Sequence, residues 1–161
     1  MILAIFLLFI SVFLESIIPN LIREFIPFFM IVAIIIISSF KIENKKAYTT
    51  IFIFGVCYDL LYTNLIIFHG FLFILLFYMC KIILKNSKNF FFMIFTYYLL
   101  IAIYCLIMFL FTMIYSNTNY IYLFIIIFKS LFINSIHFII TYVLFIGINC
   151  LIRNRNKKRS Y

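Results

Sequence analysis

The chain has 161 residues, of which 68% are hydrophobic and only 11% are charged. A soluble domain carries about 25% charged residues, so too few polar groups are present to cover a water-exposed surface. The formal net charge of +9 would suit a nucleic-acid partner, but the cations stand in short clusters between apolar runs, a pattern that encodes membrane topology. We therefore expect an integral membrane protein with no nucleic-acid partner.

The apolar runs predict an all-α, polytopic fold with six transmembrane helices. A perpendicular span needs about 20 residues, so the second and fourth runs are short and the sixth is long enough to tilt or to emerge from the membrane. One transmembrane domain, residues 1–152, is then followed by a basic tail, residues 153–161. The expected helices are, in chain order, Ile2–Ile18, Phe25–Phe40, Ala47–Ile67, Gly70–Leu84, Phe90–Tyr115 and Tyr120–Ile152.

Proline and polar residues mark the expected joints. Pro19 and Asn20 are predicted to end the first helix, and Pro27 suits the first turn of the second. The polar stretches 41–46, 85–89 and 116–119 are predicted turns. The first segment lacks a basic n-region and a small-residue cleavage site, so we expect it to stay in the membrane.

The cations predict the orientation of the helices. Eleven of the thirteen Lys and Arg residues lie at or after the ends of the second, fourth and sixth expected helices, and the positive-inside rule places that side in the cytoplasm. Both termini are then cytoplasmic, and the basic tail also lies close to acidic lipid headgroups. These cations are Lys41, Lys45, Lys46, Lys81, Lys85, Lys88, Arg153, Arg155, Lys157, Lys158 and Arg159.

Two charged residues are expected near the middle of the membrane. Asp59 lies about 18 Å from the cytoplasmic end of its helix, and Lys129 lies about 15 Å from the outer end of the last helix, at 1.5 Å per residue. An isolated charge at that depth costs at least about 2.5–3.5 kcal/mol, so one hypothesis pairs Asp59 with Lys129. The alternative leaves Asp59 protonated or hydrogen-bonded to Tyr62 or Thr63, while Lys129 extends outward.

Small and polar residues indicate helix contacts. Gly55 shares a helix face with Asp59 and would let another helix approach closely. A polar stripe on the last helix consists of Ser130, Asn134, His137 and Thr141, at spacings of four, three and four residues. Such a stripe normally faces protein, and it indicates either interhelical hydrogen bonds or a polar cavity on a transport path, in which His137 would titrate near neutral pH.

No catalytic or metal-ligand pattern is present in the sequence. The four cysteines are isolated, so we expect no disulfide, no metal and no cofactor. Glu15, Arg23 and Glu24 are placed in or near the first outer loop, and His69 with Gly70 at the outer turn between the third and fourth helices. These residues form no triad, paired carboxylate or phosphate loop, so we expect no enzyme activity.

Residues 53–64 (IFGVCYDLLYTN), followed by His69-Gly70-Phe71-Leu72-Phe73 and then Tyr78, resemble the rod shape-determining MreD family. Gly55 and Asp59 fall on the intramembrane Gly-xxx-Asp motif of that family. Asn134, the Pro19-Asn20 pair, the chain length and the basic tail are also similar. The chain departs from the family where a Gly usually stands, at Ile51 and in the turn near Ile67, and Lys129 has no counterpart.

The resemblance implies a multi-pass protein of the bacterial cytoplasmic membrane that takes part in cell-shape maintenance. Such proteins are non-catalytic members of the complex that builds lateral peptidoglycan during elongation. The implied partners are a bitopic MreC-like protein, the actin-like MreB, and the peptidoglycan polymerase and transpeptidase, besides membrane lipids.

Two other classes remain open. Six helices in a short chain, with a polar stripe, also suit the substrate-binding membrane subunit of an energy-coupling-factor vitamin transporter. Against this class, the first helix has only Ala4 in place of an Ala-rich motif, and long outer loops are missing. The third class is a small accessory protein, such as a toxin-immunity protein.

Overall fold

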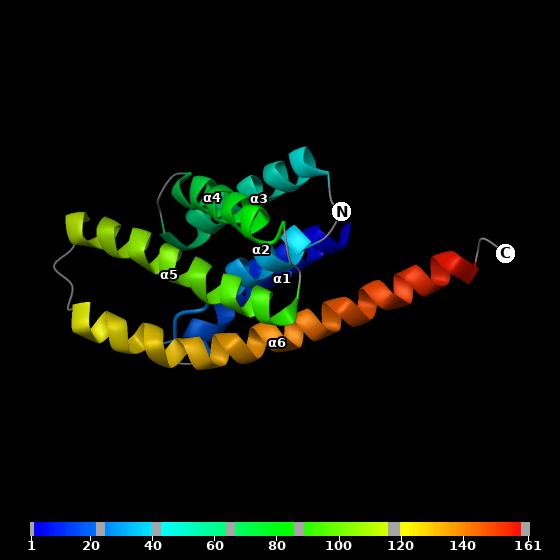
Figure 1. Ribbon diagram of the computed structural model, residues 1–161. Coiled ribbons are helices and arrows are strands. Elements are labelled where there is room, and N and C mark those ends of the chain that lie inside the picture. The colour runs from blue at the N-terminus through cyan, green and yellow to red at the C-terminus, as the bar shows by residue number, and fades with distance from the viewer. Residues whose placement is uncertain are drawn as a thin grey trace.

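The computed structural model describes residues 2–21, 25–39, 43–63, 67–85, 89–115 and 120–158, and its regular elements in these ranges are all helices (Figure 1). Five of them match five expected helices in order, and the third expected helix is divided between an α-helix and a π-helical turn. In chain order they are α1 (Ile2–Leu21), α2 (Phe29–Ser39), α3 (Asn44–Tyr58), the π-helical turn η1 (Asp59–Thr63), α4 (Phe68–Ile83), α5 (Phe90–Tyr115) and α6 (Tyr120–Lys158).

Helix α2 forms the centre of the bundle. Every residue from Phe29 to Ser38 is buried, and α2 packs against α1, α4, α5 and α6. A helix that is apolar on all sides is stable only when it is enclosed. Its 11 residues extend about 16 Å at 1.5 Å per residue, so α2 is half as long as a membrane is thick.

The predicted start of this second helix is wrong. Residues 25–28, which we call the approach segment, are not helical, and α2 begins only at Phe29. Pro27 keeps Ile26 out of the helical region because the proline ring clashes with the preceding residue. Side chains from other helices bind the backbone of this segment instead, as described below.

Other predicted boundaries also shift. Helix α1 continues to Leu21, with Pro19 in its last turn. Proline has no N–H group, so it removes one hydrogen bond there, close to the helix end. Helix α3 begins at Asn44, and α4 begins at Phe68, before the expected Gly70. Helix α5 has the predicted bounds.

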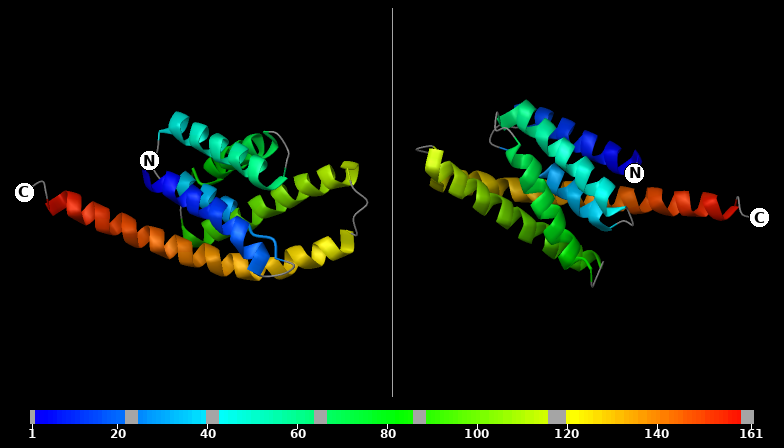
Figure 2. Two further views of the ribbon diagram at one scale, coloured as in Figure 1. Left: turned by 180° about the vertical axis from the view of Figure 1, so that it is seen from behind. Right: turned by 90° about the horizontal axis from the view of Figure 1, so that it is seen from above.

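Within the described residues, three helices are long and apolar enough to cross a membrane. Their apolar stretches are Ile2–Pro19, Phe90–Phe111 and Phe124–Ile148. Helix α6 runs along one side of the bundle and continues past it, through the first residues of the predicted tail (Figures 1 and 2). The bundle is therefore compatible with a membrane protein.

The starts of the odd-numbered helices lie at one end of the bundle, together with the ends of α2 and α6. The start of α1, the end of α2, the starts of α3 and α5 and the end of α6 lie toward the same end (Figures 1 and 2). Consecutive helices thus alternate in direction along the bundle.

Candidate functional site: a buried polar network around α2

Two glycines bring α3 and α4 into close contact. A Cβ atom on Gly55 would lie 2.6 Å from the Cα atom of Gly70 and 2.8 Å from the carbonyl oxygen of His69. Only hydrogen fits between these backbones, so the close approach expected at Gly55 is present and its partner is α4. This hairpin holds Asp59, one turn after Gly55, beside the start of α4.

Asp59 is 1% exposed and its carboxylate is held within the hairpin. Its Oδ2 atom accepts the backbone N–H of His69 at 2.7 Å. Its Oδ1 atom accepts the Thr63 hydroxyl at 2.8 Å and lies 2.6 Å from Nδ1 of His69. Three hydrogen-bonding partners thus replace the water that this carboxylate lacks.

The hypothesis that Asp59 pairs with Lys129 is wrong for this arrangement. Between these two described residues the structure has no salt bridge within 4.0 Å, and the Lys129 side chain is exposed on α6. The nearby His69 takes the position opposite Asp59, because the hairpin turn brings the two together. The alternative partner Thr63 is observed.

His69 was expected at an outer turn, but it lies in the first turn of α4 and is 0% exposed. Its Nε2 atom is 3.2 Å from the Tyr104 hydroxyl of α5. Since Nδ1 faces Asp59, both ring nitrogens have polar neighbours. The imidazole therefore links the α3–α4 hairpin to α5.

Glu15, predicted in or near the first outer loop, lies inside α1 and is 6% exposed. Its Oε1 atom accepts the backbone N–H of Met30 at 2.7 Å. An acidic group at this position satisfies a free N–H group in the first turn of α2 and interacts favourably with the helix dipole.

Ser130 and Asn134 of α6 hold the approach segment. The Ile26 N–H donates to Oγ of Ser130 at 2.9 Å, and the Phe28 N–H donates to Oδ1 of Asn134 at 2.9 Å. Nδ2 of Asn134 also donates to the Ile26 carbonyl at 2.8 Å. These bonds satisfy backbone groups that have no helical partners, so part of the predicted polar stripe supports a non-helical segment.

The rest of the stripe lies further along α6. The His137 ring packs against Phe29 at a centroid distance of 4.1 Å, and Nε2 of His137 is 3.2 Å from the Thr141 hydroxyl. Nδ1 of His137 is buried, with no hydrogen-bond partner among the described residues. His137 and Thr141 are thus separate from the network around Asp59.

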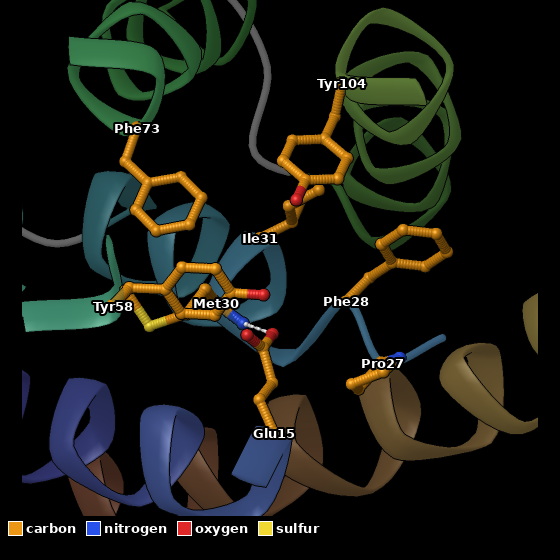
Figure 3. Close-up of a pocket in the computed structure, with 8 residues that line it drawn as sticks. All are labelled: Glu15, Pro27, Phe28, Met30, Ile31, Tyr58, Phe73 and Tyr104. Atoms are coloured by element: carbon orange, nitrogen blue, oxygen red, sulfur yellow. Dashed lines mark hydrogen bonds between the residues drawn. The ribbon is translucent and has the colours of Figure 1, made fainter. Parts of the chain in front are cut away.

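Tyr58 lies beside Glu15 at the start of α2. Its hydroxyl points toward the Glu15 carboxyl group (Figure 3). A small cavity of about 10 Å³ lies here, lined by Tyr58, Tyr104, Glu15, Pro27, Phe28, Met30, Ile31 and Phe73 (Figure 3). That volume is about the minimum that one water molecule requires.

The turn before His69 contains backbone strain at Ile67. Its φ of 69° lies in the left-handed region, which costs a β-branched residue about 1–2 kcal/mol. Ile67 is also 38% exposed, so its side chain contributes little packing. This is the turn in which MreD-like sequences usually have a glycine.

We expect Ile67→Gly to raise the free energy of unfolding by about 1 kcal/mol, because relief of the strain exceeds the extra backbone entropy that glycine loses on folding. Ile53→Gly is the control, since Ile53 is exposed within α3 and glycine in a helix costs about 1 kcal/mol. Unfolding by SDS titration in mixed micelles measures both variants. Equal losses of stability would contradict the strain.

The sequence contained a signal for one of the missed residues. Glu15 stands fourteen positions into an apolar run, and a charged residue inside such a run indicates a buried functional or structural site. Tyr58 and Tyr104 had no such signal, because they are two of 12 tyrosines in the chain.

The fold and this network define a class: an all-helical protein, compatible with a membrane protein, with a polar network enclosed at the start of a buried half-length helix. Comparison with family models, curated proteins and solved structures finds no match to the chain.

Proposed function

We propose that the chain is a non-catalytic membrane component of the bacterial cell-wall elongation complex, similar to the MreD family, with six spans in the cytoplasmic membrane and both termini in the cytoplasm. Its partners in this role are a bitopic MreC-like protein, the MreB filament, and the peptidoglycan polymerase and transpeptidase.

One observation carries this proposal: the residues behind the resemblance have connected structural roles. Gly55 and Gly70 form a close backbone contact within the α3–α4 hairpin, and Asp59 closes that hairpin through His69. Asn134 holds the approach segment of the central helix. The motif therefore supports a rigid scaffold, which suits a protein that acts by assembling partners.

The cavity beside Glu15 suits a scaffold, because its volume of about 10 Å³ is about the minimum that one water molecule requires. Glu15 is engaged with the backbone of α2, and the Tyr104 hydroxyl lies 3.2 Å from Nε2 of His69.

The proposed orientation is supported by the positions of the basic residues at the helix ends. Lys45 and Lys46 begin α3, Lys81 and Lys85 lie at the end of α4, and basic residues end α6. The start of α3 and the end of α6 lie toward the same end of the bundle (Figure 2), and this is the end that the positive-inside rule assigns to the cytoplasm.

The proposal predicts that depletion of the protein in its host stops most lateral peptidoglycan incorporation and, in a rod-shaped host, makes the cells round. Fluorescent D-amino acid labelling measures incorporation. Photocrosslinking residues at Ile53 of α3 and Phe132 of α6, both exposed, are expected to capture the MreC-like partner from at least one position. Unchanged incorporation, or capture of a transporter subunit instead, would reject the elongation role.

A further inference from the structure

The α3–α4 hairpin carries a cluster of lysines at one end of the bundle. Lys45 and Lys46 lie in the first turn of α3. Lys81 lies in the last turn of α4, and Lys85 follows that helix. The side chains of Lys45, Lys46 and Lys85 are exposed, and that of Lys81 is half-buried. Two helices thus bring four cations to the same end of the hairpin.

A side-chain contact joins the two helix ends. The Lys81 ammonium group donates to Oδ1 of Asn44, the first residue of α3, and lies over the Phe77 ring, 5.1 Å from the ring centroid. The rings of Phe77 and Tyr48 pack edge to face at a centroid distance of 5.0 Å. Lys81 is therefore held in the seam between α3 and α4, at the residue that precedes Lys45.

Positive charge exceeds negative charge at this end. Among the described residues, Glu43 is the one acidic residue here, and it forms a salt bridge with Lys46 at 2.6 Å. One carboxylate therefore faces four lysines. Glu43 forms no side-chain hydrogen bond with the first turn of α3, so the positive end of that helix dipole adds to the potential. Such a concentration of positive charge favours an anionic ligand.

An exposed apolar surface continues from the lysines along both helices. On α4, four exposed residues at spacings of four, three and four share one helix face; they are Phe71, Leu75, Tyr78 and Ile82. Phe52 of α3 lies two turns after Lys45 on the same face, and its ring packs edge to face on Phe71 at 5.4 Å. We call these five residues the apolar strip, which ends at the lysines.

We propose that this end of the hairpin binds an anionic phospholipid, with the headgroup phosphate at Lys45, Lys81 and Lys85 and an acyl chain along the apolar strip. A soluble anion would match only the lysines, whereas an anionic lipid matches the lysines and the strip together. Basic pockets between transmembrane helices bind acidic headgroups in this way. The site rests on the proposed membrane setting, in which this end lies at the cytoplasmic headgroups.

Native mass spectrometry of the full-length protein in detergent measures the binding of single lipid molecules. The protein is titrated with phosphatidylglycerol or with phosphatidylcholine of the same acyl chains. We expect the first phosphatidylglycerol to bind at least about fivefold more tightly, because one lysine near an anionic surface contributes about that factor. The double variant Lys45→Gln with Lys85→Gln is expected to lower the phosphatidylglycerol affinity about 25-fold for the same reason.

Matched controls come from the last helix. Lys157→Gln with Lys158→Gln removes the same charge from the end of α6, and we expect it to leave the affinity unchanged. Phe71→Ala tests the apolar strip and is expected to weaken binding about fivefold, roughly half the value of burying a phenylalanine side chain. Phe128→Ala removes a similarly exposed phenylalanine of α6 and should have no effect.

Three results would overturn the lipid site. Equal affinity of the wild type for the two lipids would remove the role of charge, and equal losses in the two double-lysine variants would mean that net charge alone attracts the lipid. Displacement of the lipid by an equal concentration of inorganic phosphate would identify a phosphate site instead. SDS titration in mixed micelles checks that each variant folds. None of these measurements requires a partner protein, so their failure would leave the elongation role standing.

Discussion

Replacement of Asn134 by Leu is expected to lower the free energy of unfolding by about 2–5 kcal/mol. The change leaves the Phe28 N–H and the Ile26 carbonyl without the partners that they have now, and each buried unpaired polar group costs about 1–3 kcal/mol. Interhelical side-chain bonds in membranes average only about 0.6 kcal/mol. The expected loss of stability is larger here because the unpaired groups belong to a non-helical backbone that has no internal partners.

Ser135→Ala on the same helix is the control for this prediction. The Ser135 hydroxyl donates to the Leu131 carbonyl of its own helix and lies 2.8 Å from the Tyr98 hydroxyl at an exposed position, so its loss should cost under about 1 kcal/mol. SDS titration in mixed micelles gives both free energies. If Asn134→Leu costs no more than Ser135→Ala, the hydrogen bonds from Asn134 to the approach segment contribute nothing to stability.

The apolar runs were enough to predict the order of the helices along the chain. Helix α5 has the predicted bounds because a long apolar run ends in polar residues on both sides. The start of α2 was not predictable in this way, since residues 25–28 are as apolar as the helix that follows. Their backbone is held by Ser130 and Asn134, which lie more than 100 positions later.

The partners of the charged residues were likewise not predictable from the apolar pattern. Depth along a helix singled out Asp59, which is buried in the bundle, but depth alone could not choose its partner. Lys129 was predicted at the same membrane depth as Asp59. His69, ten residues after Asp59 along the chain, lies across the hairpin turn and contacts it. Geometry at the turn, set by η1 and Ile67, decided the pairing, and hydropathy contains no information about that geometry.

The contact at Gly55 supports the second large prediction, that Gly55→Ala lowers the free energy of unfolding by about 3 kcal/mol. The added Cβ would lie 2.6 Å from Gly70 Cα and 2.8 Å from Gly70 N. Both are backbone atoms, so no side-chain rotation relieves the overlap and α4 must move away, at the upper end of the cost of overpacking. The same movement would lengthen the Asp59–His69 bonds, one turn away.

The other two glycines make this prediction a graded series. At Gly70 a Cβ would meet side-chain atoms of Phe52 and Val56 at 3.0–3.1 Å, and because side chains can shift, Gly70→Ala should cost about 1 kcal/mol. At Gly147 nothing lies within 4 Å, and alanine should stabilise α6 by up to about 1 kcal/mol. Unfolding of the three variants in mixed micelles tests the order. Equal effects at Gly55 and Gly147 would mean that α3 and α4 do not touch at this point, and Asp59 and His69 would then have no reason to meet.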